Sequence, residues 1–504
     1  MNAAQLATES IEKYGEYTAF HFEGRSWSNL EHAAYSGRVA AVLRDAGVVP
    51  GDVVLVVMPN CPEVLACFQA AWKLGAVIAP ITPQLNETEI AYVLGHSEAK
   101  VAIAAPETVA RTVAAAGRIA NPPRILVIGA SPESSAPDIS ANIAGAAPIA
   151  TVAERSGDDL AFLLYTSGTT GHPKGVMLTH DNIVTNHRAV ASFGRLKERS
   201  STLLVLPMSH SFGVLIMNLC HIFGATASVH RKFEPVEVLE AIERYKVTRF
   251  SAVPTMLVRL INCPDRTRFD LSSLEIVNSG ASILPNEVRV EFERLYHCKV
   301  LDGYGLSECA PTACSYPASE TIRPGAVGKP IPGVQVVIQN EAGEILPAGE
   351  VGEICIKGPN VMKGYLKDEA ATLDALRGGW LHSGDVGYAD ADGYVYLTDR
   401  MKDLIIKGGE NISPREIEEA LYQHPAVAEA AVVGVPDATY GESIVAAVAL
   451  KPGGTATEPE MIAHAAKFVT KFKLPSRVIF VESLPKNANG KIDRKVIRAD
   501  VKKG

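Results

Sequence analysis

Short, nearly uncharged apolar runs alternate with longer helical patterns over the first three hundred residues of the chain. Between the runs, stretches such as 63–74 and 234–246 repeat apolar residues every three or four positions, as helices do. Apolar runs without polar alternation indicate strands that are buried on both faces, which is typical of parallel sheets covered by helices. The runs that we expect to form such strands are 52–58, 100–104, 124–129, 160–165, 203–207 and 275–278.

Two segments depart from this pattern. Residues 105–157 are rich in Ala, Pro and Ser, and we expect a looser connection there between two such units. From 325 to 400, many glycines and frequent turn sequences separate short strands, which indicates a small antiparallel barrel or sheet. The predicted fold class is therefore α/β, with a large N-terminal domain of two doubly wound sheets plus a small β-barrel.

A last unit begins near Lys402, and its first helix has clear start signals. Ser413 is the expected N-cap, Pro414 occupies the first helical position, and Glu416 completes a capping box. Two or three strands and another helix follow, enough for a small α+β domain. The predicted boundaries are an N-terminal domain at 1–401 and a C-terminal domain at 402–504.

The composition is that of a globular protein. The chain has 504 residues, of which 47% are hydrophobic and 21% charged, and a net charge of −8. This mild acidity disfavours nucleic-acid partners, which normally require a basic surplus. The eight cysteines form no CxxC pair, which predicts reduced thiols and, without a recognisable signal peptide, a cytoplasmic protein. Monomer and homodimer both remain open.

The stretch 200–230 contains no Asp, Glu, Lys or Arg. Pro207, Gly213 and Gly224 interrupt it, so its longest clean piece falls well short of the ~20 apolar residues that a membrane-spanning helix needs. We expect a buried strand followed by a buried helix, and no stable membrane insertion.

The most informative motif is the segment 165–175, which directly follows a predicted buried strand. Its small hydroxyl residues and glycines allow backbone amides to approach an oxyanion closely, and Lys174 adds a positive charge. The segment is not a Walker A loop, because Pro173 precedes the lysine and Gly175 follows it. It therefore predicts a phosphate-binding loop of another kind and disfavours a P-loop NTPase.

This segment resembles the signature phosphate loop of the adenylate-forming superfamily, which includes acyl- and aryl-CoA synthetases, luciferases and the adenylation domains of peptide synthetases. The chain is most similar to fatty-acid and medium-chain acyl-CoA synthetases. Further segments resemble, in order, the family's acid-pocket segment, adenine-pocket turn, Tyr-Gly-x-Thr-Glu motif, ribose site, interdomain hinge and two C-terminal functional loops. They are 207–213, 279–282, 302–308, 383–385, 399–403, 407–411 and 489–495.

The resemblance implies an ATP site, with Ser307 standing where the family usually has threonine. Asp385 would accept hydrogen bonds from the ribose hydroxyls, with Arg400 nearby. The implied ATP- and AMP-binding residues are Thr166, Ser167, Gly168, Thr169, Thr170, Gly171, Lys174, Gly280, Ala281, Ser282, Asp302, Gly303, Tyr304, Gly305, Leu306, Ser307, Asp385, Arg400 and Lys491.

The chemistry of acid activation explains why such residues are needed. A carboxylate that attacks the α-phosphorus of ATP gives an acyl-adenylate and pyrophosphate through a transition state that gathers negative charge. By resemblance, Lys491 is the lysine that bridges the carboxylate and the α-phosphate. Glu308 offers a hard oxygen ligand that suits Mg²⁺, with Thr169 as its partner. By resemblance, His210 would lie where carboxylate, adenylate and thiol meet, and would gate or orient them without acting as an acid or a base.

The second half-reaction is thioester formation on CoA. In the family the C-terminal domain is mobile, and it rotates about a hinge that falls here at Lys402. The segment Lys407-Gly408-Gly409 would then replace Lys491 over the active site and admit a pantetheine arm.

The acid itself is constrained by the uncharged stretch. Amino-acid-activating relatives supply an Asp near Gly213 that pairs with the substrate ammonium, so an amino acid is a poor fit here. A dicarboxylate would need a cation in the pocket, and Arg231 and Lys232 lie just outside the stretch. A monocarboxylic acid with an apolar tail remains. The expected pocket residues are His210, Phe212, Gly213, Val214, Cys309 and Ala310.

Alternatives remain open at this point. A stand-alone ligase could load its acyl-adenylate onto the phosphopantetheine of an acyl carrier protein, and an aryl acid or a dicarboxylate could replace the fatty acid. A serine hydrolase is excluded because no Ser lies in a Gly-x-Ser-x-Gly elbow. A catalytically inactive scaffold would be expected to have lost Lys174, Glu308 or Lys491, and all three are present.

Overall fold

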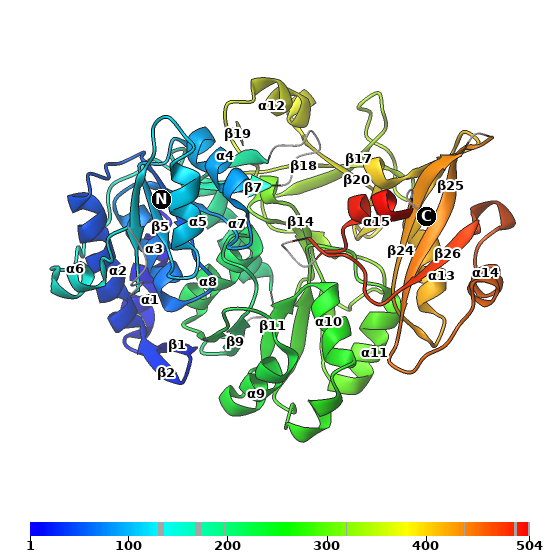
Figure 1. Ribbon diagram of the computed structural model, residues 1–504, viewed down its shortest axis with the longest axis horizontal. Helices are drawn as coiled ribbons and strands as arrows, with labels where there is room; N and C mark the ends of the chain where they lie inside the picture. The colour runs from blue at the N-terminus through cyan, green and yellow to red at the C-terminus, as the bar shows by residue number, and fades with distance from the viewer. Residues whose placement is uncertain are drawn as a thin grey trace.

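The computed structural model describes residues 1–129, 136–166, 173–194, 197–318, 320–437, 439–487 and 491–501. Within these ranges the chain forms two seven-stranded sheets, two small antiparallel sheets and a five-stranded C-terminal sheet. The N-terminal elements lie at one end of the molecule and the C-terminal sheet at the other, with the second large sheet and its helices between them (Figure 1). The expected α/β class, with a large N-terminal part and a small α+β C-terminal part, is confirmed.

The first large sheet has the order β19-β8-β7-β4-β3-β5-β6. Its central strands are parallel, whereas β8 and β19 run antiparallel at one edge. β3 reads Val-Val-Leu-Val-Val and is buried over most of its length, as a strand with helices on both faces must be. The elements are β3 Val53–Val57, β4 Val77–Pro80, β5 Val101–Ala104, β6 Arg124–Val127, β7 Leu160–Thr166, β8 Lys174–Thr179 and β19 Gly364–Tyr365, with helices α2 Asn29–Asp45, α3 Pro62–Lys73, α4 Glu87–Ser97, α5 Val109–Ala116, α6 Ser140–Gly145 and α7 His180–Phe193.

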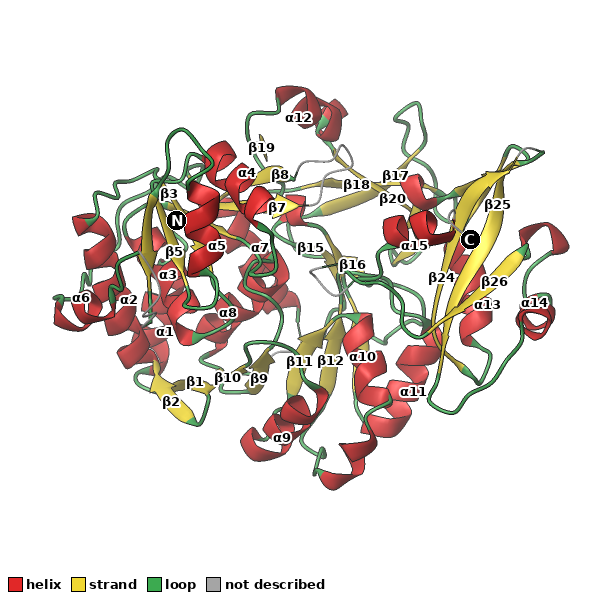
Figure 2. Ribbon diagram, in the orientation of Figure 1, coloured by secondary structure: helices red, strands yellow, loops and turns green. Residues whose placement is uncertain are grey.

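The second large sheet has the order β13-β12-β11-β9-β10-β1-β2, parallel except for β2 at its edge. Helices α9, α10 and α11 lie along one side of it (Figure 2). The elements are β1 Thr18–Phe22, β2 Arg25–Ser28, β9 Ser201–Leu204, β10 Thr226–Val229, β11 Arg249–Ala252, β12 Ile276–Ser279 and β13 Lys299–Asp302, with helices α1 Gln5–Tyr14, α8 Ser211–Phe223, α9 Pro235–Tyr245, α10 Pro254–Ile261 and α11 Asn286–Tyr296.

The remaining elements are antiparallel, apart from the parallel pairing of β26 with β25. Two small sheets follow the large ones, as the Gly-rich segment predicts. They contain β14 Tyr304–Gly305, β15 Thr312–Ser315 and β16 Lys329–Pro330, then β17 Gln335–Gln339, β18 Gly352–Lys357, β20 Leu381–Ala389 and β21 Val395–Arg400, with α12 Glu369–Ala375 between β19 and β20. The C-terminal elements are β22 Ile405–Lys407, β23 Glu410–Ile412, β24 Val427–Asp437, β25 Gly441–Leu450, β26 Arg477–Val481, α13 Pro414–Tyr422, α14 Glu458–Ala465 and α15 Arg494–Val501.

The uncharged stretch 200–230 forms the expected strand and buried helix, β9 and α8, and continues into a further strand, β10, that was not predicted. Among the described residues, no helix combines the length and apolarity needed to cross a membrane. The segment 105–157 is more regular than expected, because α5 and α6 lie within it.

The predicted capping box of α13 is wrong, although Ser413 is the N-cap and Pro414 begins the helix, as expected. Ser413 is the N-cap of α13, but it makes no side-chain bond to the helix, because its hydroxyl lies 2.7 Å from the Asp399 carboxylate. Asp399 itself accepts from the backbone N–H of Arg415, at 3.2 Å, and therefore satisfies a donor of the first turn. Glu416 forms an ion pair with Lys473 instead, at 2.6 Å. The Asp399 carboxylate, at the end of β21, therefore caps α13 in place of the Ser413 and Glu416 side chains.

Candidate active site

A cavity of about 800 Å³ is lined by residues at the carboxyl ends of strands from both large sheets. Ligands of open α/β sheets bind in this position, and the volume is that of a small-molecule site. Strand β20, the segment after β21 and the C-terminal segment around Lys491 complete the lining.

Most of the predicted site residues meet at this cavity, although they come from segments that lie far apart in the sequence. Those that line it are Thr166, Lys174, His210, Phe212, Gly280, Ala281, Asp302, Gly303, Tyr304, Gly305, Leu306, Ser307, Glu308, Asp385, Arg400, Lys402 and Lys491. The predicted residues Ser167, Gly168, Thr169, Thr170 and Gly171 lie outside the described residues.

Four of the six expected acid-pocket residues are not among those that line the cavity. Val214, Cys309 and Ala310 are almost fully buried in the hydrophobic core. Gly213 is constrained by packing, because a β-carbon there would lie 2.5 Å from the carbonyl oxygen of Pro207. His210 and Phe212 are the two members that line the cavity.

Ser282 and the Lys407-Gly408-Gly409 segment also lie away from the cavity lining. Gly408 and Gly409 connect β22 and β23 with φ values of 59° and 85°, the left-handed turn for which paired glycines are preferred. Lys407 donates to the carbonyl of Phe472 at 2.6 Å, and its ammonium lies 4.7 Å from the centre of that ring. Lys407 is therefore held by the C-terminal unit itself.

The Asp385 carboxylate is buried and held from two sides. Its Oδ2 accepts from the Tyr304 hydroxyl at 2.8 Å, and its Oδ1 accepts from Nε of Arg400 at 2.9 Å. The negative charge of Asp385 raises the pKa of Arg400, and burial together with Asp385 raises the pKa of Tyr304 well above its usual value. Because each carboxylate oxygen accepts more than one hydrogen bond, the pair is oriented to receive hydroxyl groups from a ligand.

Glu308 and Lys174 are linked through a residue that no sequence motif indicated, Tyr365. The Tyr365 hydroxyl donates to Oε1 of Glu308 at 2.9 Å, and the Lys174 ammonium lies 4.7 Å from the centre of the Tyr365 ring. Tyr365 is placed there by the pairing of β19 with β8, in which it faces Val176. A cation at the start of β8 and a carboxylate therefore share one aromatic support.

Lys491 is the cation that the C-terminal segment contributes to the cavity. Its backbone N–H donates to the Asn487 side chain at 3.1 Å, and its carbonyl accepts from the Asn487 N–H at 2.8 Å. Burial and the nearby Arg400 lower the pKa of Lys491 to about 8, while Asp385 and Glu308 act in the opposite direction. A desolvated ammonium among other cations is suited to an anionic ligand.

His210 forms the N-cap of α8. Its Nδ1 accepts from the backbone N–H of Phe212 at 3.2 Å, which leaves the proton of the neutral ring on Nε2. Burial, with a further contribution from Lys491, lowers the pKa of His210 to about 3. A histidine that is neutral throughout the physiological range can orient a ligand through its Nε2–H but is not suited to act as a general acid.

Polar residues that sequence reasoning missed also line the cavity. Arg249, Ser251 and Asn278 do so from β11 and β12. The cations considered from the sequence lie elsewhere: Arg231 forms an ion pair with Glu23 at 2.6 Å, and Lys232 one with Glu234 at 3.1 Å. Arg249 is therefore a cation of the cavity lining that the sequence motifs did not indicate.

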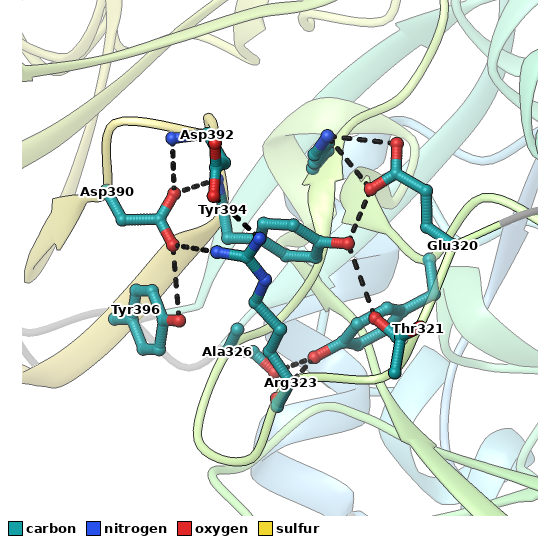
Figure 3. Close-up of polar contacts among 10 residues, drawn as sticks. Glu320, Thr321, Arg323, Ala326, Asp390, Asp392, Tyr394 and Tyr396 are labelled. Carbon is teal, nitrogen blue, oxygen red and sulfur yellow. Dashed lines mark hydrogen bonds and ion pairs between the residues drawn. The ribbon is translucent and has the colours of Figure 1, made fainter.

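Figure 3 shows a polar network around Arg323, Asp390 and Asp392. This network supports the wall of the cavity at Tyr316. The Tyr316 hydroxyl donates to the carbonyl oxygens of Arg323 and Ala326, at 2.7 and 2.9 Å. Arg323 in turn forms ion pairs with Asp390 and Asp392, at 2.8 and 2.7 Å. The loop after β15 is thus fastened to the turn between β20 and β21.

The cysteines of the chain are buried, except for Cys263, which is half-buried. Cys314 lines the cavity, and Cys309 lies directly behind it in the core. Burial raises the pKa of both thiols well above the usual value. Both side chains are therefore thiols, not thiolates, at physiological pH.

Comparison with known proteins identifies the family. A model of the AMP-binding enzymes matches residues 7–366, and a model of the AMP-binding enzyme C-terminal domain matches residues 416–491. The long-chain-fatty-acid–CoA ligase of Bacillus subtilis (strain 168) is 35% identical over 519 residues, which cover 97% of this chain and 93% of that protein. The oxalate–CoA ligase of Arabidopsis thaliana is 34% identical over 506 residues, which cover 98% and 97%.

A solved structure agrees with these relatives. The crystal structure of a benzoate CoA ligase from Burkholderia xenovorans LB400 is similar with a TM-score of 0.90, at 28% identity, over 99% of this chain and 100% of that chain. The relatives are named for acids of different kinds and share the CoA-ligase activity. This chain therefore belongs to the adenylate-forming family of AMP-binding enzymes and is an AMP-forming acid–CoA ligase.

Proposed function

We propose that the chain activates a carboxylic acid with an apolar body, of which fatty monocarboxylic acids are the simplest members, and transfers the acyl group to the thiol of CoA. The observation that carries the proposal is the single cavity in which Lys174, Glu308, Asp385, Arg400 and Lys491 meet an apolar wall. That wall includes Val190, Leu215, Ile216, Leu219 and Leu301. Groups suited to bind phosphate, ribose and a carboxylic acid therefore line the same cavity.

In the first half-reaction, the carboxylate oxygen attacks the α-phosphorus and pyrophosphate leaves. Lys491 would bridge the carboxylate and the α-phosphate, where negative charge develops, and Lys174 would hold the departing phosphates. Asp385 would receive the ribose hydroxyls, because Tyr304 and Arg400 orient its carboxylate. His210 would orient the acid in its neutral form.

Glu308 fits the Mg²⁺ ion that adenylation requires, because a carboxylate at the edge of a phosphate site is the ligand that Mg²⁺ prefers. Tyr365 holds one of its oxygens in place by a hydrogen bond of 2.9 Å. The second expected ligand, Thr169, lies outside the described residues. When bound, the ion would supply positive charge to the phosphates.

In the second half-reaction, the CoA thiol attacks the acyl carbonyl and AMP leaves. We propose that the domains 1–401 and 402–504 rotate about Lys402, so that the Lys407-Gly408-Gly409 turn replaces Lys491 at the cavity. Support comes from the position of Lys402 in the cavity lining and of that turn outside it. An acyl carrier protein is the alternative acceptor.

The first test is acid-dependent ATP–pyrophosphate exchange with Mg²⁺, using short, medium and long fatty acids, aryl acids and amino acids. Exchange with acids of apolar body but not with amino acids is expected. Isolated acyl-adenylate is then offered CoA or phosphopantetheinylated carrier protein. Lys407→Ala is expected to impair this transfer and leave exchange intact, with Lys451→Ala on an exposed turn as the control. Refusal of CoA with acceptance of the carrier would overturn the choice of acceptor.

A further inference from the structure

A buried cation, Arg249, lines the cavity and has no role in the adenylation steps described above. This residue is only 8% exposed. It belongs to β11, a central strand that pairs with β12 through Ile276 and with β9 through Thr202. Both faces of such a strand are normally apolar, because water reaches neither.

The alternation of β11 separates two environments. Phe250 and Ala252 are fully buried, and Phe250 packs in the core under α9, α10 and α11 with Val277 of β12. Arg249 and Ser251 point to the opposite face, since side chains two residues apart share a face, and both line the cavity. One face of β11 thus packs in the hydrophobic core, and the other presents polar side chains to the cavity; we call this second face the polar floor.

Asn278 extends this floor to the neighbouring strand. It pairs with Ser251 in the register of β11 and β12, and it also lines the cavity. The same cavity is lined by Leu215, Ile216 and Leu219 of α8, which offer an apolar surface. The cavity thus combines an apolar surface with polar groups on β11 and β12, as in a site that binds an apolar ligand and recognises a polar group on it.

Arg249 is set back along β11 from the turn that we expect to face the nucleotide. The backbone N–H of Gly280 donates to the carbonyl of Ala252 at 3.2 Å, which puts the end of β11 beside the turn expected to face the nucleotide. Arg249 is three residues earlier, about 10 Å along a strand that rises about 3.3 Å per residue. An extended chain advances about 3.6 Å for every three bonds, so about eight bonds span that distance.

We propose that Arg249, with Ser251 and Asn278, binds an oxygen acceptor at the end of the acid remote from the activated carboxylate. The substrate class is an acid with an apolar body of medium length that ends in a carboxylate, hydroxyl or phenol oxygen. Arg249 has a partner within the protein, and the five N–H donors of a guanidinium serve more than one acceptor. This inference rests on the proposed function and specifies its substrate.

The test compares matched acids in the exchange assay. Octanoate, 8-hydroxyoctanoate and octanedioate form one series, and cinnamate and 4-hydroxycinnamate form another. In the wild-type enzyme, kcat/KM is expected to be higher for an oxygen-bearing member than for its unsubstituted partner. Preference for octanedioate over 8-hydroxyoctanoate identifies a carboxylate as the distal group, and the reverse order identifies a neutral oxygen.

The variant Arg249→Met keeps the length of the side chain and removes its charge. It is expected to lower the preference for the oxygen-bearing acid by about 10- to 150-fold, the range for a hydrogen bond to a charged group, mainly through KM. Exchange with octanoate then remains, which excludes a general loss of folding. Arg249→Lys is expected to recover part of the preference. Arg259→Met, at an α10 position whose side chain is 47% exposed, is expected to retain all of it.

Two failures can be told apart. If the wild-type enzyme supports exchange with octanoate or cinnamate and gains nothing from the distal oxygen, the role of Arg249 is overturned and the proposed function stands. The same holds if Arg249→Met leaves the ratio unchanged. If no acid of either series supports exchange, the proposed function and its refinement fall together.

Discussion

The depressed pKa of Lys491 makes adenylation sensitive to alkaline pH. An ammonium on an exposed loop keeps a pKa near 10.5, whereas burial and Arg400 lower that of Lys491 to about 8. Only the protonated form can bridge a carboxylate and a phosphate. Because the pKa in the folded protein is lowered, this form is present below about pH 8 and is lost as the pH rises through that value.

The magnitude follows from the titration of one group. With a pKa of about 8, roughly nine-tenths of Lys491 is charged at pH 7 and roughly one-tenth at pH 9. The kcat/KM of a free enzyme follows the protonation of its essential group, so it is expected to fall about tenfold per pH unit above pH 8. No loss from this group is expected between pH 6 and pH 7.

Acid-dependent exchange is the suitable assay, because it needs no thiol whose own titration would interfere. The variant Lys491→Arg keeps its charge at every pH tested. Its kcat/KM is therefore expected to be lower than that of the wild-type enzyme but no longer to fall above pH 8, so that the alkaline limb of the pH profile is lost. Lys402 also has a pKa lowered by burial and lines the cavity, which makes Lys402→Arg the matched control, with the limb retained. A wild-type profile that is flat to pH 10, or a limb that persists in Lys491→Arg, would refute the reasoning.

Three further predictions concern the nucleotide, the helix and the metal. Asp385→Asn is expected to raise the KM for ATP by about 10-fold or more without changing the KM for the acid. The substitution removes a charged acceptor for the ribose hydroxyls, and a hydrogen bond to a charged group contributes about 1.5–3 kcal/mol. Gly213→Ala is expected to cost about 1–3 kcal/mol in denaturant unfolding, because its β-carbon would lie 2.5 Å from the Pro207 carbonyl, whereas Gly145→Ala meets nothing and is expected to be nearly neutral. Glu308→Gln is expected to raise the Mg²⁺ concentration needed for half-maximal exchange, and an unchanged requirement would remove Glu308 as a ligand.

Six strands of the two large sheets could be predicted, because continuous apolar runs have few other uses in a globular chain; they are β3, β5, β6, β7, β9 and β12. Among the strands that were missed is β11, because Arg249 and Ser251 make its sequence look like a turn or an exposed segment. Its polar face is explained only by a cavity, and the cavity exists only once both sheets are assembled. A local pattern cannot reveal a surface that distant segments create.

The same limit applies to contacts between side chains. Motifs placed Glu308 and Asp385 in the site, but the hydroxyl on Glu308 comes from Tyr365, which is 57 residues away. The capping box at Ser413 failed for a related reason, since the Ser413 hydroxyl donates to Asp399 and Glu416 pairs with Lys473. Sequence reasoning identifies which groups are available, and the tertiary structure decides which partner each one takes.

Because Cys314 and Cys309 stay protonated, the enzyme is protected from acylating its own thiols during turnover. An acyl-adenylate is a mixed anhydride that acylates any thiolate within reach, and Cys314 lines the cavity in which it would form. Burial keeps both sulfurs protonated and therefore weakly nucleophilic. The enzyme can thus hold a reactive acylating agent beside its own sulfur atoms and reserve the acyl group for the thiol that arrives from outside.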